Sequence, residues 1–146
     1  KKNSKLKNLP EKIFINRKDG TINRKNGTSL RYIINNNQVE DFLKKKGFKS
    51  LTMSDYSFVD QVALFNNAKE IIGLHGAAFA NLIFCKPKTK IIEMRPDTAG
   101  VVIKTLAVNN DLNYFDIISK PKTINFNNQL GDIEINIDTI KKIINS

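Results

Sequence analysis

The sequence predicts an α/β, Rossmann-like domain, a three-layer fold in which helices cover both faces of a parallel sheet. Three observations predict it. Short apolar segments rich in Ile alternate with segments of helical spacing. Such alternation implies parallel strands joined by right-handed crossovers, and apolar strands imply a sheet that is covered on both faces. A length of 146 residues allows one core of this size, and we find no repeat and no linker that divides it.

Strands are expected where short apolar runs end in polar residues or turn signals. In chain order they cover residues 12–16, 48–53, 70–74, 90–94 and 114–118, with a weaker candidate at 132–137. Because a basic, Asn-rich lead-in occupies residues 1–11, the domain is expected to span residues 12–146.

Helices are expected between these strands. The spacing of Val39, Phe42 and Leu43 predicts a helix that starts near Asn35, with Asn side chains available as caps, and ends at Gly47. Four other helices are expected. One starts at Ser57, one follows the third strand and ends near Cys85, one covers residues 99–109, and the last starts at Asp138.

The helix that starts at Ser57 has a specific signal at its first turn. Ser57 and Asp60 form a pair like a capping box. The apolar face of this helix is expected to consist of Phe58, Val62 and Phe65.

Composition narrows the classes of function. The chain carries a net charge of +10, and residues 1–50 hold 14 Lys and Arg against 4 Asp and Glu. This excess of positive charge would favour binding to nucleic acid, to an anionic membrane surface or to a phosphorylated substrate. The alternative is that the Lys-rich start of the chain is only solvated. The single cysteine, Cys85, excludes an internal disulfide and a cysteine-based metal site. With no apolar run long enough for a membrane span and no hydrophobic leader, a cytoplasmic setting is expected.

The residues that follow each strand are the candidates for ligand binding, because ligands of such folds bind beyond the carboxyl ends of the strands. In chain order these are Arg17 and Lys18, Ser54 and Asp55, His75 and Gly76, and Arg95.

The segment at residues 73–77, Gly-Leu-His-Gly-Ala, has the features of a phosphate-binding loop. Small residues allow the backbone to approach a ligand closely, and the expected helix after it would direct N–H groups toward an anion. The segment is neither the dinucleotide fingerprint nor a P-loop. His75, the sole histidine, is placed to donate to phosphate or to act as an acid or base, although a structural role is the alternative.

Five further side chains have open alternatives. Glu93 lies in an apolar strand and needs a hydrogen-bond partner, either ligand hydroxyls or backbone. Arg24 and Arg31, with Arg17, either clamp an oxyanion or lie in a solvated loop. Asn81 is expected to cap or orient the turn, and Cys85 is read as a core residue rather than a nucleophile.

Five pieces of the chain, in their order and spacing, resemble glycosyltransferase family 61. They are residues 15–18, 31–40, 60–68, 71–84 and 90–94, so the likeness extends over about residues 12–96. Where the family loop commonly reads Gly-Ala-Gly-Leu-Thr-Asn, residues 76–81 read Gly-Ala-Ala-Phe-Ala-Asn, which removes a glycine and a hydroxyl.

The resemblance implies one half of a GT-B enzyme, the C-terminal domain that holds a nucleotide sugar, often a UDP-sugar. It implies that Arg17 and residues 75–77 contact the diphosphate, that residues 53–56 lie near the base, and that Glu93 approaches ribose or sugar. It also implies an inverting transfer without bound metal or other cofactor, and an acceptor site with the general base on an N-terminal domain absent from this chain. The bacterial relatives act in capsular or surface polysaccharide assembly, which suggests a place at the inner face of the membrane.

Two alternatives to a transferase stay open. One is a module that binds an anionic polymer such as nucleic acid or polysaccharide, which explains the charge but not the loop. The other is a scaffold with a degenerate loop. Nucleic acid ranks lower because basic and aromatic residues do not interleave as on single-strand binding surfaces.

Overall fold

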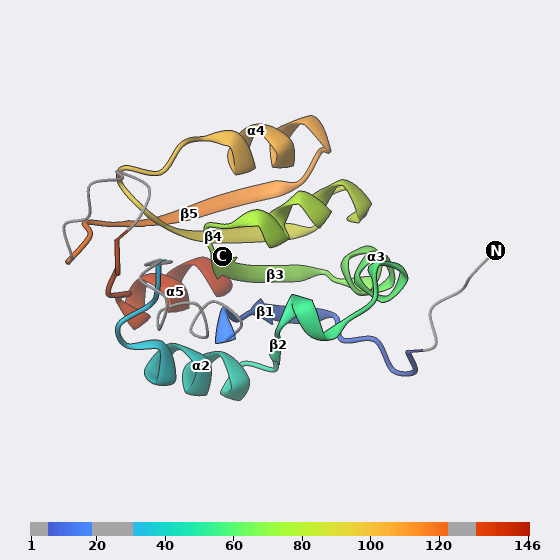
Figure 1. Ribbon diagram of the computed structural model, residues 1–146, viewed down its shortest axis with the longest axis horizontal. Helices are drawn as coiled ribbons and strands as arrows, with labels where there is room; N and C mark the ends of the chain where they lie inside the picture. Colours follow the sequence, from blue (N-terminus) through green and yellow to red (C-terminus); the bar gives the residue numbers. More distant parts are fainter. Residues whose placement is uncertain (1–5, 19–30, 123–130) are drawn as a thin grey trace.

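Five strands form one sheet in this computed structural model, which describes residues 6–18, 31–122 and 131–146. All neighbouring strands are parallel, and their order is β2-β1-β3-β4-β5 (Figure 1). The strands are β1 (Lys12–Ile15), β2 (Lys49–Leu51), β3 (Glu70–Leu74), β4 (Lys90–Pro96) and β5 (Asn113–Ser119). The parallel α/β fold is thereby confirmed. The weaker strand candidate at residues 132–137 is wrong, because only an isolated bridge between Ile33 and Ile133 forms there.

Helices connect the strands. They are α2 (Asn36–Lys45), α3 (Phe58–Asn67), α4 (Val102–Asn109) and α5 (Ile137–Ile144), together with the 3₁₀ helices η2 (Met53–Asp55) and η3 (Ala77–Phe84). The expectation that the second strand reaches Met53 is wrong, since this residue starts η2. The expected end of α2 at Gly47 is confirmed, because this glycine has a φ of 84°.

Two cores lie on opposite faces of the sheet, so the three layers are confirmed. Successive strand residues point to opposite faces. Ile71 and Ile91 therefore pack with α3, η3 and α4, whereas their neighbours Ile72 and Ile92 pack with α2 and α5.

The capping predictions differ in outcome. Ser57 Oγ accepts from the N–H of Asp60 at 3.3 Å and donates to its carboxylate at 2.7 Å, which confirms the capping pair. The cap by Asn35 is wrong, because this side chain donates to the carbonyl of Ile135 at 2.8 Å and accepts from its N–H at 2.9 Å. It thus joins the start of α2 to the segment before α5.

The apolar face expected for α3 is wrong in part. Leu64 and Phe65 are the buried residues of the helix, and Val62 is half-buried. Phe58 is 66% exposed and meets the ring of Phe84 edge-on at 5.7 Å. At the first turn of the helix, its side chain covers η3 from outside instead of entering the core.

The segment after β3 winds as a 3₁₀ helix, whereas the sequence predicts an ordinary helix there. The N–H of Phe79 donates to the carbonyl of Gly76 at 3.1 Å, three residues back. Phe79 and Leu82 are both fully buried. A 3₁₀ helix places residues three apart above one another, so this winding directs both side chains into the same core.

The strand order fixes where a ligand can enter. From β1 the chain crosses to β2 on one side, and from β3 it crosses to β4 on the other. The two connections leave the sheet in opposite directions, so a crevice opens beyond the carboxyl ends of β1 and β3, which is where doubly wound folds bind ligands.

Candidate functional site

The crevice at the ends of β1 and β3 contains two adjoining hollows. The larger, of about 130 Å³, is lined by Ile15, Asn16, Arg17, Met53, Leu74, Gly76, Ala77 and Ala78. The smaller, of about 50 Å³, is lined by Phe14, Ile15, Arg17, Lys18, Tyr32, Ile33, Asn36 and Leu74. Arg17 borders both hollows, so the structure brings together two of the segments that the sequence singled out.

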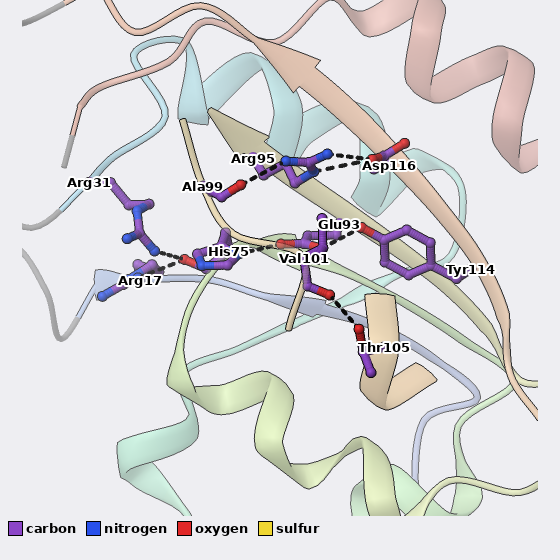
Figure 2. A network of polar contacts seen from close by, with 10 residues as sticks. All are labelled: Arg17, Arg31, His75, Glu93, Arg95, Ala99, Val101, Thr105, Tyr114 and Asp116. Carbon is purple, nitrogen blue, oxygen red and sulfur yellow. Dashed lines mark hydrogen bonds and ion pairs between the residues drawn. The ribbon is translucent and has the colours of Figure 1, made fainter. Parts of the chain in front are cut away.

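Two arginines converge on one backbone oxygen at this crevice (Figure 2). The carbonyl of His75 accepts from Arg17 Nη1 at 3.2 Å and from Arg31 Nη1 at 2.6 Å. Burial lowers the pKa of Arg31, the charge of Arg17 lowers it further, and Glu93 acts in the opposite direction. An anion between these guanidinium groups would relieve their mutual repulsion, and each group offers paired donors to a phosphate.

Gly76 is the residue that makes room for Arg17. A Cβ atom at this position would lie 2.6 Å from Arg17 Nη1. The backbone of Gly76 is extended, with φ 174° and ψ 174°. Glycine is therefore required at this position because the arginine approaches it closely, and not because the backbone conformation is unusual.

Gly73 has a different role in the structure. A Cβ atom there would lie 3.1 Å from Ile15 Cβ and 3.3 Å from the ring of Phe79. Gly73 thus lets β1 and η3 pack closely against β3, and a direct contact between this buried residue and phosphate stays a prediction.

The side chain of His75 is anchored beneath the crevice. Its Nδ1 atom pairs with Oε1 of Glu93, a residue with no exposed surface. The other carboxylate oxygen, Oε2, accepts from the hydroxyl of Tyr114 at 2.5 Å. The partners of Glu93 are therefore side chains, and neither the backbone nor the ligand hydroxyl expected from the sequence is needed to satisfy it. A contact of Glu93 with ribose or sugar stays a prediction.

Arg95 holds the loop that follows β4. Its guanidinium donates to Asp116 Oδ2 from Nε at 3.1 Å, and its Nη1 donates to the carbonyl of Ala99 at 3.0 Å (Figure 2). Although it was expected after the fourth strand, Arg95 lies inside β4. It fixes the entry to α4 and does not face the two arginines on His75.

Asn16 is a buried polar residue that the sequence analysis did not single out. Its side chain donates to Ser50 Oγ at 2.9 Å and accepts from Thr52 Oγ1 at 2.6 Å and from the N–H of Lys18 at 3.2 Å. It ties the end of β1 to β2 and so directs Arg17 toward the crevice. A polar residue at the end of an apolar run was the available signal.

Asn81 does not face the crevice. Its Nδ2 donates to Gln61 Oε1 at 2.8 Å, and Gln61 Nε2 donates in turn to the carbonyls of Met53 at 3.0 Å and Tyr56 at 3.1 Å. Asn81 therefore orients the loop at residues 53–56 through Gln61. The turn that Asn81 was expected to cap or orient is the one after β3, and its described contact is with a different loop. A direct ligand contact stays a prediction.

The remaining candidates lie at the margin of the site. Lys18 is exposed, and its Nζ pairs with Glu40 at 3.4 Å. Ser54 is exposed in η2. Arg24 lies outside the described residues. Burial raises the pKa of Cys85 to about 12, which agrees with a core thiol rather than a nucleophile.

The described residues contain neither a cluster of metal ligands nor a helix that could span a membrane. Across residues 6–18, 31–122 and 131–146, no three His, Cys, Asp or Glu side chains gather as metal ligands would. Within the same ranges, every helix is too short or too polar to cross a bilayer.

Comparison with known proteins gives one finding. The family model described as Glycosyltransferase 61 matches residues 1–92, which include Arg17, Arg31, His75 and Gly76. No curated protein matches the chain.

Proposed function

The chain belongs to glycosyltransferase family 61, and from this premise we propose that it binds the diphosphate of a nucleotide-sugar donor between β1 and β3. Membership of the family makes glycosyl transfer the activity in general terms. The observation that carries the finer proposal is the convergence of Arg17 and Arg31 on the carbonyl of His75. Two guanidinium groups that meet at one carbonyl oxygen are suited to bind a ligand with two adjacent negative groups, such as a diphosphate.

The start of η3 supports the same ligand. The first bond of this helix is made by the N–H of Phe79, so the N–H groups of Ala77 and Ala78 precede it. Both of these residues line the larger hollow. Backbone donors and the positive end of a helix favour an anion there.

The proposed reaction is the attack of an acceptor hydroxyl on the anomeric carbon of the bound sugar. The bond from that carbon to the diphosphate breaks, and the nucleoside diphosphate departs with its additional negative charge. Arg17 and Arg31 would stabilise this charge as it develops. We propose an inverting transfer to a polysaccharide or glycan, with a general base from a second domain of a GT-B enzyme and with no need for a metal.

The nucleoside would lie toward η2. Met53 lines the larger hollow beside Ala77 and Ala78, and Gln61 holds the loop that carries it. An apolar wall next to a fixed loop suits a planar base. We propose uridine as the nucleoside, in line with the family resemblance.

Calorimetric titration of the 146-residue chain with UDP, GDP, CDP and UDP-sugars tests the proposal. We expect saturable binding of one diphosphate, lost in Arg17→Ala and weakened in Arg17→Lys, which keeps the charge but not the paired donors. Lys69→Ala is the matched control, because its partner Glu11 is exposed and the pair lies at the opposite end of the sheet. Equal affinities of Arg17→Ala and Lys69→Ala would refute the site.

A further inference from the structure

Three side chains from three adjacent strands form a continuous path beneath the arginines. Tyr114 on β5 donates to Glu93 on β4, and Glu93 pairs with Nδ1 of His75 directly after β3 (Figure 2). The backbone carbonyl of the same histidine then accepts from Arg17 and Arg31. The path therefore runs from the edge strand β5 to the proposed diphosphate site.

We propose that Glu93 and Tyr114 are positioning residues for His75, which keep its proton on Nδ1, reserve Nε2 for the donor and fix the carbonyl that gathers the two arginines. This inference rests on the proposed function, since it assigns to His75 a part in binding the donor.

The sheet register places the three groups together. Gly73 lies opposite Glu93, and Ile91 lies opposite Tyr114. Glu93 is two residues after Ile91 and therefore faces the same side of the sheet, toward η3 and α4. Gly73 itself carries no side chain, and Ile15 and the ring of Phe79 pack over it beside Glu93.

The charge on Glu93 determines the direction of each hydrogen bond. An ionised carboxylate only accepts, so both neighbours must donate to it. Burial and the hydrogen bond to Glu93 raise the pKa of Tyr114, which keeps its hydroxyl protonated. The negative charge of Glu93 acts in turn to raise the pKa of Arg31.

The pairing of Nδ1 with Glu93 leaves Nε2 as the ring nitrogen of His75 that could meet the donor. Since Nδ1 holds its proton against Glu93, the neutral ring presents a lone pair at Nε2. Among the described residues, no partner is recorded for that atom. A ring with a proton on Nε2 as well as on Nδ1 would be a cation that donates to a phosphate oxygen, with Glu93 balancing the charge beneath it.

Nitrogen NMR of the histidine ring tests this assignment directly. The chain has one histidine, so every imidazole signal belongs to His75. We expect the neutral ring to carry its proton on Nδ1. In Glu93→Gln, where the amide oxygen still accepts from Nδ1 but carries no charge, a larger share of the neutral rings should carry the proton on Nε2. Arg17, Arg31, Arg95, Tyr114 and Asp116 are unchanged in that variant, so the change in tautomer reports on Glu93.

A second variant keeps the charge and removes only a hydroxyl. Tyr114→Phe should leave the fold intact and weaken UDP binding by about two- to tenfold, because Glu93 loses one of its two donors. Thr105→Val is the matched control, since it removes a hydroxyl whose bond to the carbonyl of Val101 lies within α4. Its UDP affinity should equal that of the unmodified chain.

Two results would overturn the inference. One is a neutral His75 with its proton on Nε2, and the other is an identical ratio of the two His75 tautomers in the unmodified chain and in Glu93→Gln. If Glu93→Gln does not fold, equal UDP affinities of Tyr114→Phe and Thr105→Val overturn it. If the unmodified chain binds no nucleotide, the proposed function fails, and the NMR result alone still decides whether Glu93 positions His75.

Discussion

Replacement of Gly76 by alanine should weaken ligand binding by displacing Arg17 without lowering the stability of the fold. The new Cβ would lie 2.6 Å from Arg17 Nη1 and 3.4 Å from its Cζ, while the nearest backbone atom, the carbonyl oxygen of Leu74, is 3.6 Å away. The extended backbone at this position is open to any residue. Only the end of a flexible side chain has to move, so the substitution should displace the guanidinium and leave the fold unchanged.

The expected magnitude follows from the contact that is lost. A hydrogen bond to a charged group contributes about 1.5–3 kcal/mol, which corresponds to about a 10- to 150-fold weaker affinity for UDP. The free energy of unfolding should change by less than about 1 kcal/mol, because no core contact is altered. Calorimetric titration measures the first quantity, and urea denaturation measures the second.

Gly100→Ala is the matched control for this experiment. A Cβ at Gly100 would have no atom within 4 Å, so both affinity and stability should stay the same or rise slightly. The steric argument is refuted if Gly76→Ala and Gly100→Ala bind UDP equally well while Arg17→Ala does not bind it. A large loss of stability in Gly76→Ala alone would also contradict it.

Four further outcomes are expected. Ser57→Ala should lower the free energy of unfolding by about 1 kcal/mol through loss of the cap on Asp60, and an unchanged urea midpoint would contradict this. Asn35→Ala should cost about 1–3 kcal/mol, because the N–H and carbonyl of Ile135 both lose a partner; a loss no larger than a few tenths would speak against that role. Cys85, whose pKa burial raises to about 12, should react with iodoacetamide at pH 8 far more slowly in the native chain than in urea, and equal rates would disprove its burial. EDTA should leave the dissociation constant for UDP unchanged, whereas weakening that Mg²⁺ reverses would show that a metal takes part in binding.

Local patterns were sufficient for the order of elements. The five main expected strands each overlap an observed one, because a short apolar run between polar residues has few other ways to bury itself, whereas the weaker candidate at residues 132–137 forms no strand. The pair of Ser57 and Asp60 was predicted correctly for a similar reason, since both partners lie within one turn. Arg17, Arg31 and the loop that begins at Gly73 were also found as candidates from their places after the strands or between them.

Predictions that depended on packing were less accurate. Asn35 is a good cap by residue type, yet its side chain bonds to Ile135, 100 residues away in sequence. Phe58 fits the apolar face of a helix, but it lies at the surface against Phe84. In both cases a distant segment competes with the local preference, and its position is not encoded in the neighbouring residues.

By itself, the sequence determined that strands and helices alternate, that small residues follow the third strand, and that basic residues follow the first. Only the tertiary structure decided that Arg31 reaches the carbonyl of His75 and that Tyr114 reaches Glu93. The physical reason is the sheet. Strand order and register bring together atoms that are 44 and 21 residues apart, and both depend on how whole faces pack rather than on the periodicity of any one segment.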